Sequence, residues 1–195
     1  QTTNALSREK ELGSANPHHA SLLQTIQWSY QKLKPIEQQV FLAMCVFVAP
    51  VHEQAILAVS FDSPGQLEMT TLPYVLNILC NKHLLRRNHQ PGRRTQYALM
   101  IPIRNILREN WTSVDLWATL QARQVAYFEH LANQPESKAS HAEHLVWTQQ
   151  IDYNYHNVIV ALEWCQTHAP ARALHIAANL ADYWQSRGYW HDGRR

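Results

Sequence analysis

The stretch TIQWSYQKLKPIEQQVFLAMCVF, residues 25–47, decides the fold. Its first half continues an apolar spacing of three to four residues that begins just upstream and predicts an amphipathic helix. Its second half is apolar almost all round, so its helix should lie at the centre of a core. We therefore expect Trp28 and Tyr30 to pack around that helix and not to bind a ligand. The residues that carry the first spacing are Leu22, Ile26, Tyr30 and Leu33.

The second helix of this stretch should begin at Pro35, because a proline at the first helical position loses no hydrogen bond. Glu37 follows near the positive end of the helix dipole, where a carboxylate is stabilising. The apolar residues that leave this helix almost no polar face are Val40, Phe41, Met44, Phe47 and Val48.

Two further helices are expected downstream. The first is a short helix over residues 52–59, and the second covers residues 72–85. Pro73 is tolerable in the second helix only near its first turn, because proline breaks a helix interior.

The one β signal is a pair of short strands at residues 84–88 and 96–100. They flank HQPGRR, in which Pro91-Gly92 has type II turn chemistry. Helices followed by a basic hairpin form a winged helix-turn-helix pattern. IPIRNILREN then continues the second strand as a helix.

From Ser113 onward the pattern is helical, with breaks at NQPES and at HAP. Antiparallel helix pairs with short loops and alternating large and small stripes are typical of the start of a helical-repeat solenoid. The three apolar stripes are Val114, Trp117, Leu120, Phe128 and Leu131; Trp147, Ile151, Tyr155, Val158, Leu162 and Cys165; and Ala173, Ala177, Leu180, Ala181 and Trp184.

These patterns predict a mainly α chain with three parts. Residues 1–17 form a linker or tail, residues 18–110 a winged-helix domain with a small β-hairpin, and residues 111–195 antiparallel helical-repeat hairpins that are cut short at their C-terminus. The missing initiator methionine and the ending GRR lead us to expect a piece of a longer protein.

The composition is globular, with 46% hydrophobic and 16% charged residues among 195. No apolar run approaches the roughly 20 residues that span a bilayer, so no membrane contact is expected. The net charge of +2 is not basic enough to require nucleic acid. Cys45, Cys80 and Cys165 are odd in number and far apart, which indicates free thiols in a reducing cytoplasm.

The sequence contains no motif for catalysis. It has five glycines and neither a Gly-x-x-x-x-Gly-Lys-Ser/Thr phosphate loop nor a glycine-rich dinucleotide turn, so we expect no enzyme activity from this chain. His141 and His144 stand three apart on a helix, with Glu143 between them, and Cys165 and His168 repeat that spacing. Each set is half a metal site at most, and solvated surface histidines are the better interpretation.

A basic cluster surrounds the predicted hairpin: Lys82, Arg86, Arg87, Arg93 and Arg94. Such a wing could contact DNA phosphates, could be a solvated hairpin, or could dock on an acidic partner module.

The helix before the wing decides between these alternatives, because it would enter the major groove of DNA. It contains no Lys or Arg between residues 72 and 81, and only Asn77 and Asn81 could contact a base. DNA binding is therefore the weaker interpretation. The apolar residues of this helix that we expect to be buried are Leu72, Val75, Leu76 and Leu79.

Three stretches together resemble the bacterial STAND-class regulatory ATPases, which are relatives of NB-ARC proteins and large LuxR-type regulators. Residues 18–48 resemble the segment that opens their winged-helix domain, with His18 and Leu23 in place of arginines. Residues 75–85 are similar to the stretch before the wing, with His83 in place of serine. Residues 144–195 look like the first tetratricopeptide-like helices. The matching residues are His19, Trp28, Ser29, Tyr30, Leu33, Pro35, Glu37, Val46 and Phe47; Val75, Leu76, Leu79, Lys82, Leu84 and Leu85; and Asn157, Ala161, Leu162, Trp164, Arg187, Gly188, Gly193 and Arg194.

The resemblance implies a regulatory segment from the middle of a signalling ATPase. A nucleotide-binding domain that holds ATP or ADP would lie upstream, and a helical-repeat sensor for a protein or peptide would lie downstream. No cofactor is implied for this chain itself. The alternatives are a DNA-binding winged helix of a transcription regulator and a self-contained helical adaptor that binds a protein.

Family relatives carry Met-His-Asp after the wing, where the histidine senses the diphosphate. The matching residues here are Met100, Ile101 and Pro102. Isoleucine has no hydrogen-bond donor for a phosphate. Arg104 is the nearest group that could substitute, and a surface or salt-bridging role for it is the alternative.

Overall fold

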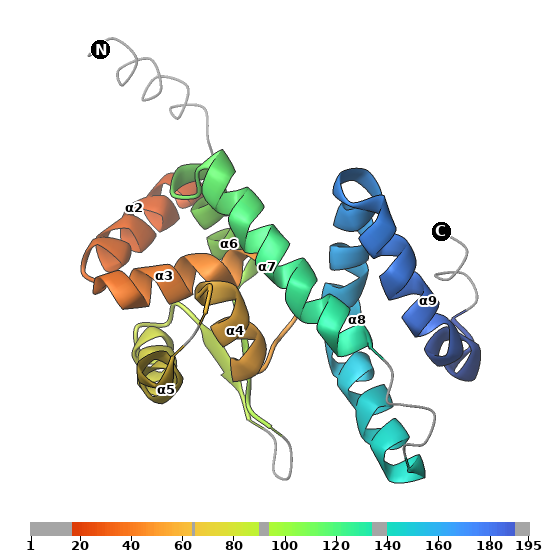
Figure 1. The fold of residues 1–195 in the computed structure, drawn as a ribbon. Coiled ribbons are helices and arrows are strands. Elements are labelled where there is room, and N and C mark those ends of the chain that lie inside the picture. The colour runs from red at the N-terminus through yellow and green to blue at the C-terminus, as the bar shows by residue number, and fades with distance from the viewer. Residues whose placement is uncertain (1–16, 64, 90–93, 134–139, 190–195) are drawn as a thin grey trace.

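The computed structural model describes residues 17–63, 65–89, 94–133 and 140–189. The chain is mainly helical with one small two-stranded antiparallel sheet, as expected (Figure 1). In the described residues the elements are α2 (Pro17–Gln31), α3 (Pro35–Ala43), a 3-10 turn η1 (Met44–Val46), α4 (Glu53–Ser60), α5 (Gln66–Asn81), β1 (Arg86–Asn88), β2 (Gln96–Ala98), α6 (Ile101–Asn110), α7 (Val114–Ala132), α8 (His141–His168) and α9 (Pro170–Arg187).

Helix α3 lies at the centre of the N-terminal half and begins at Pro35 as predicted. The carboxylate of Glu37 accepts a hydrogen bond of 3.0 Å from the Lys34 backbone N–H, which caps the first turn. Val40 and Phe41 are completely buried. The prediction for Val48 is wrong: its side chain is 43% exposed, because η1 and the extended Phe47 end the helix before it.

The two aromatic residues of α2 have different surroundings. Tyr30 stacks on Trp111 with ring centroids 5.2 Å apart and also contacts Phe41, so it packs against the central helix as expected. Trp28 is 61% exposed and lies under the Lys32 ammonium group, 3.8 Å from the ring centroid. The expectation that Trp28 packs around the central helix is therefore wrong.

Helix α5 begins six residues earlier than predicted, so Pro73 lies in its interior. The carbonyl of Met69 thereby loses its usual N–H partner. Both residues are exposed, and water can satisfy that carbonyl. At the other end, His83 takes a left-handed conformation with φ of 55° and turns the chain toward β1.

The sheet is shorter than predicted but pairs in the expected way. Arg86 lies opposite Ala98, and Arg87 lies opposite Tyr97. Val51, just before α4, pairs with the other edge of β2 through two backbone hydrogen bonds to Tyr97 of 2.9 and 2.8 Å. The order across the hairpin is therefore Val51, β2, β1. The predicted type II turn at residues 91–92 lies outside the described residues.

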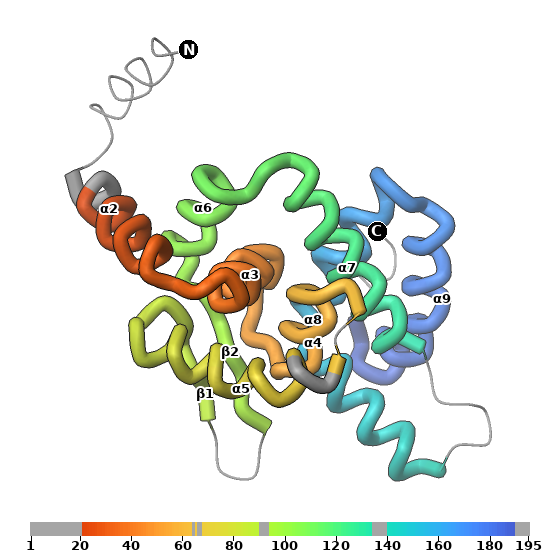
Figure 2. The backbone as a smooth tube through the Cα atoms, turned by 60° about the vertical axis from the view of Figure 1, so that its left-hand side comes forward, coloured from red at the N-terminus to blue at the C-terminus, as the bar shows by residue number. Residues whose placement is uncertain are grey.

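Helix α7 connects the two halves of the molecule. It packs on α4 on one side and on α8 and α9 on the other (Figures 1 and 2). The Ser113 hydroxyl caps its first turn by accepting a 3.1 Å hydrogen bond from the Leu116 N–H. Phe128 is completely buried and meets Phe47 edge to face, with ring centroids 6.4 Å apart. Val114 is 85% exposed, so its place in the predicted stripe is wrong.

Helices α8 and α9 form the antiparallel pair expected from their stripes. Ile151 and Val158 are completely buried, whereas Ala181 of the third stripe is exposed. Ile176 and Tyr183 fill that side of α9 instead. The helix pair turns at residues 168–170 as predicted, and Gly188 ends α9 with φ of 73°.

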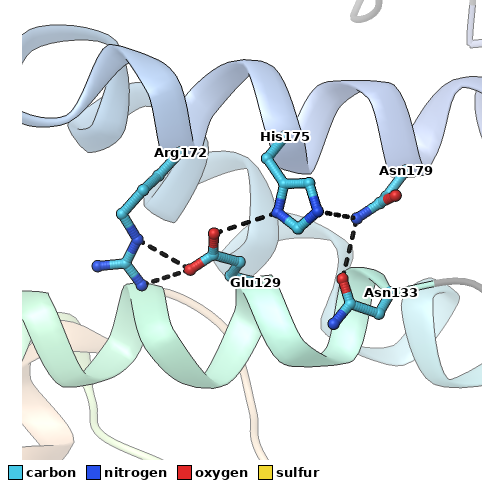
Figure 3. Close-up of polar contacts among 5 residues, drawn as sticks. All are labelled: Glu129, Asn133, Arg172, His175 and Asn179. Carbon is cyan, nitrogen blue, oxygen red and sulfur yellow. Dashed lines mark hydrogen bonds and ion pairs between the residues drawn. The ribbon is translucent and has the colours of Figure 1, made fainter.

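A polar network joins α7 to α9 on the outside of the molecule (Figure 3). Arg172 donates to the Glu129 carboxylate from Nε at 2.8 Å and from a terminal nitrogen at 2.5 Å. His175 Nδ1 donates to the other oxygen of Glu129 at 3.2 Å. Asn179 Nδ2 donates to Asn133 Oδ1 at 2.9 Å. The network therefore fixes how α9 lies on α7.

This network predicts a loss of stability in acid. Burial raises the pKa of Glu129, but the hydrogen bonds from Arg172 and His175 prevail and hold the pKa below its ordinary value of 4.5. A carboxyl group with a lowered folded-state pKa stabilises the fold fully above its unfolded pKa. That contribution disappears as the pH falls from about 4.5 through the lower folded-state pKa.

The measurement is the urea midpoint at a series of pH values below about 5. Glu129→Gln should flatten the decline, whereas Glu163→Gln, an exposed change on α8, should leave it as in the parent chain. An unchanged decline in Glu129→Gln would show that the network carries none of the acid sensitivity.

All three cysteines are free, as predicted; Cys45 and Cys165 are buried and Cys80 is half-buried. Burial raises the pKa of the Cys45 thiol to about 11, so it stays protonated and unreactive at neutral pH. Among the described residues, no helix combines the length and apolarity needed to cross a bilayer.

Candidate functional site

The predicted basic cluster is divided among different partners. Arg87 donates a 2.8 Å hydrogen bond to Asn77 Oδ1 on α5. Arg94 donates a 3.1 Å hydrogen bond to Gln54 Oε1 on α4. Lys82 and Arg86 are exposed at the end of α5 and on β1. Arg93 lies outside the described residues. Since Arg87 and Arg94 turn toward different helices, the hairpin does not present all its charges on one side.

Helix α5, the candidate for groove entry, buries the four apolar residues that the sequence singled out: Leu72, Val75, Leu76 and Leu79. Its exposed side carries no Lys or Arg, while Met69 is 51% and Tyr74 is 61% exposed. Asn77, one of the two possible base-reading residues, already accepts its hydrogen bond from Arg87. This exposed side is partly apolar, and Glu68 in the first turn is the one charged residue of the helix.

The three residues that the resemblance matched to a nucleotide sensor lie at the start of α6. Met100 caps the helix, Ile101 is 63% exposed, and Pro102 follows in the first turn. These residues border an open hollow of about 510 Å³ that Arg86 and Arg87 also line. The structure therefore brings the two arginines of β1 next to residues 100–102, which the sequence analysis considered as a separate site.

Arg104, the residue considered as a substitute sensor, is half-buried on α6. Its guanidinium group donates a 3.2 Å hydrogen bond to the backbone carbonyl of Phe47. It is thereby directed at the segment that follows η1. Residues 46–49 also accept hydrogen bonds from, and donate them to, side chains of α7 and α8.

Two buried carboxamides hold the same segment. Gln124 on α7 donates a 3.0 Å hydrogen bond from Nε2 to the Val46 carbonyl. Asn157 on α8 accepts from the Val48 and Ala49 N–H groups at 2.9 and 3.1 Å, and donates to the Ala49 carbonyl at 3.2 Å. We call Arg104, Gln124 and Asn157, acting on residues 46–49, the main-chain clamp.

The two carboxamides of the main-chain clamp are buried between the N-terminal and C-terminal halves of the molecule. Gln124 is 2% exposed and Asn157 is completely buried. Buried carboxamides are costly unless their polar atoms are paired, and these bond to backbone groups that themselves need partners. The segment from the N-terminal half is thus fixed by side chains from α6, α7 and α8. Residue-level reasoning missed this clamp. The available signal was a polar residue, Asn157, beside the apolar stripe of α8.

A cleft opens where the hairpin and α4 face the pair α7 and α8. It encloses about 310 Å³. Burial raises the pKa of Tyr127 in its wall, against the opposing effect of the Arg94 cation. The residues that line the cleft are His52, Gln54, Asn88, Arg94, Gln96, Tyr127, Leu131, Val146, Gln149, Gln150, Tyr153 and Asn154.

Among the residues that the structure describes, the histidine pairs weighed as metal ligands do not join a larger donor set. Within the described ranges, no three His, Cys, Asp or Glu side chains gather to hold an ion. His168 instead stacks on Trp164 with ring centroids 4.4 Å apart.

No protein-family model, curated protein or solved structure matches this chain.

Proposed function

We propose that this chain is the regulatory segment of a cytoplasmic STAND-class ATPase. A winged-helix-type unit would carry tetratricopeptide-like hairpins and couple an upstream nucleotide-binding domain, which holds ATP or ADP, to a downstream helical sensor. The chain itself performs no catalysis. The observation that supports this proposal most directly is the main-chain clamp, since it ties the hairpin-bearing half to the helical half.

The order of elements also supports a winged-helix-type unit. Helix α3 is followed by the Val51 bridge, the helix pair α4 and α5, and the β1–β2 hairpin. A helix, an isolated β-bridge, a helix pair and a two-stranded hairpin follow one another in the order expected of a winged helix-turn-helix. The resemblance of residues 18–48 and 75–85 to such domains supports the same interpretation.

The main-chain clamp suggests how a signal would pass. Residues 46–49 are bonded to α6, α7 and α8 at once, so a shift of α8 must move this segment or break its hydrogen bonds. Packed elements of this kind change between discrete arrangements and do not deform continuously. Binding of a protein or peptide at the downstream repeats could bias such a change, and the N-terminal half would pass it to the ATPase domain.

The test of this proposal begins with the gene. A phosphate-loop motif is expected within the few hundred residues upstream, and the purified parent protein should bind ATP or ADP. Asn157→Ala in that parent should change its ATPase rate, while Asn154→Ala on the same helix should not. A parent protein without a phosphate loop would leave the helical adaptor as the better interpretation.

A second prediction concerns DNA. Helix α5 has no Lys or Arg and a partly apolar exposed side, which favours contact with a protein surface, so we expect no salt-dependent binding to random duplex DNA. The measurement is fluorescence anisotropy of a labelled duplex between low and physiological salt, with Arg86→Ala/Arg87→Ala as the comparison variant. A steep fall of affinity with salt that this variant abolishes would establish the wing as a DNA-binding surface.

A further inference from the structure

The charged residue that lines the cleft between the hairpin and the α7–α8 pair is a cation, Arg94. It lies at the rim of the cleft, with one terminal nitrogen held by Gln54. His52 Nδ1 lies 3.0 Å from the Thr95 carbonyl, which can only accept, so Nδ1 carries the proton of that hydrogen bond. The described residues that line the cleft include no Asp or Glu. An anionic group would therefore meet attraction there and no repelling carboxylate.

The second feature of the cleft is its supply of carboxamides. Each carboxamide offers both a donor and an acceptor, as a peptide group does. The four whose side chains bond to no other described residue are Asn88, Gln96, Gln149 and Gln150. They come from opposite walls, since Asn88 and Gln96 belong to the hairpin and Gln149 and Gln150 to α8. An extended main chain between the walls could pair with both.

The third feature is the apolar part of the wall. Tyr127 and Leu131 come from α7, and Val146 and Tyr153 come from α8. Both α8 residues have accessible surface: Val146 is 53% exposed and Tyr153 is 39% exposed. Small side chains of a bound segment could pack on them. The cleft volume lies at the lower end of the range of about 300–1,000 Å³ for ligand pockets.

We propose that this cleft binds a short peptide segment by its main chain and by a carboxylate. The four carboxamides named above bond the peptide groups, Arg94 pairs with the carboxylate, and the tyrosines cover the small side chains. A guanidinium–carboxylate pair is one of the stronger polar contacts available to a protein. Peptide binding here needs no upstream nucleotide-binding domain, so it can fail or succeed independently of the proposed function.

The test uses the chain in solution with acetyl-Ala-Ala-Ala as the probe. Its free acid and its C-terminal amide are titrated separately, and the side-chain amide resonances of the protein are followed by NMR. The free acid should shift the resonances of the cleft carboxamides, and the amide should bind at least tenfold more weakly. Arg94→Gln should remove the preference for the acid, because the carboxylate loses its partner.

Two further variants keep the test decisive. Arg86→Gln removes an exposed guanidinium group from the same hairpin that does not line the cleft, so it should leave affinity unchanged. Gln149→Ala/Gln150→Ala changes two exposed residues of α8 and should weaken the acid and the amide alike. Equal binding of acid and amide, or no shift at millimolar peptide, overturns the proposal. Shifts caused by adenosine monophosphate but not by the peptide overturn it as well and assign the cleft to a nucleotide.

Discussion

Asn157→Ala is expected to lower the free energy of unfolding by about 3 kcal/mol. The change removes two acceptor contacts and one donor contact to the backbone at Val48 and Ala49. Those groups then lose their partner at a site where Asn157 itself was completely buried. Urea unfolding followed by circular dichroism measures the loss, and the m-value should stay constant if the native surface does not change.

Asn154→Ala is the matched control for this prediction. Asn154 lies on the same helix and is 4% exposed, but the 2.9 Å hydrogen bond of its side-chain nitrogen goes to the Gln150 carbonyl of its own helix. Its loss should cost about 1 kcal/mol. Equal costs for the two variants would mean that the bonds to Val48 and Ala49 contribute nothing beyond an ordinary carboxamide.

Phe128→Ala is expected to cost about 4 kcal/mol, the usual effect of removing a fully buried aromatic ring. Phe128 faces Phe47 from the N-terminal half and is packed beside Tyr127 within α7. The cavity would open where α7 passes between the two halves. Both halves should therefore lose stability together, and unfolding should remain a single transition.

Thermal unfolding read by tryptophan fluorescence and by far-ultraviolet circular dichroism checks this prediction. Val114→Ala on the same helix is the control, because an 85% exposed side chain contributes little to the core. Two separated transitions in Phe128→Ala would show that the halves fold as independent units and that α7 belongs to only one of them.

The local elements could be predicted from the sequence because local rules determine them. Pro35 with Glu37, the apolar stripe of α8 and Gly188 each act within a few residues, and each was placed correctly. The errors in predicted burial concern side chains whose helix face turned out to be exposed to solvent. Trp28 and Val114 fit an apolar spacing, yet they lie on the outer side of their helices, and spacing alone does not show which side is covered.

The main-chain clamp and the cleft depend on contacts between distant residues, which the sequence could not show. Arg87 and Arg94 are close in sequence but bond to different helices. Arg104 and Asn157 are 53 positions apart but hold the same short segment. No periodicity or turn rule relates such residues, because their meeting depends on how α6, α7 and α8 pack. The cleft arises in the same way from four separate parts of the chain.

The main-chain clamp has an evolutionary consequence. It recognises Val48 and Ala49 solely by their amide and carbonyl groups, which every residue except proline possesses. Mutation could replace the exposed Val48 side chain freely without loosening the joint. Conservation of the main-chain clamp depends instead on Arg104, Gln124 and Asn157, which lie on three different helices. Relatives that retain these three residues could differ widely in sequence at the positions that correspond to residues 46–49.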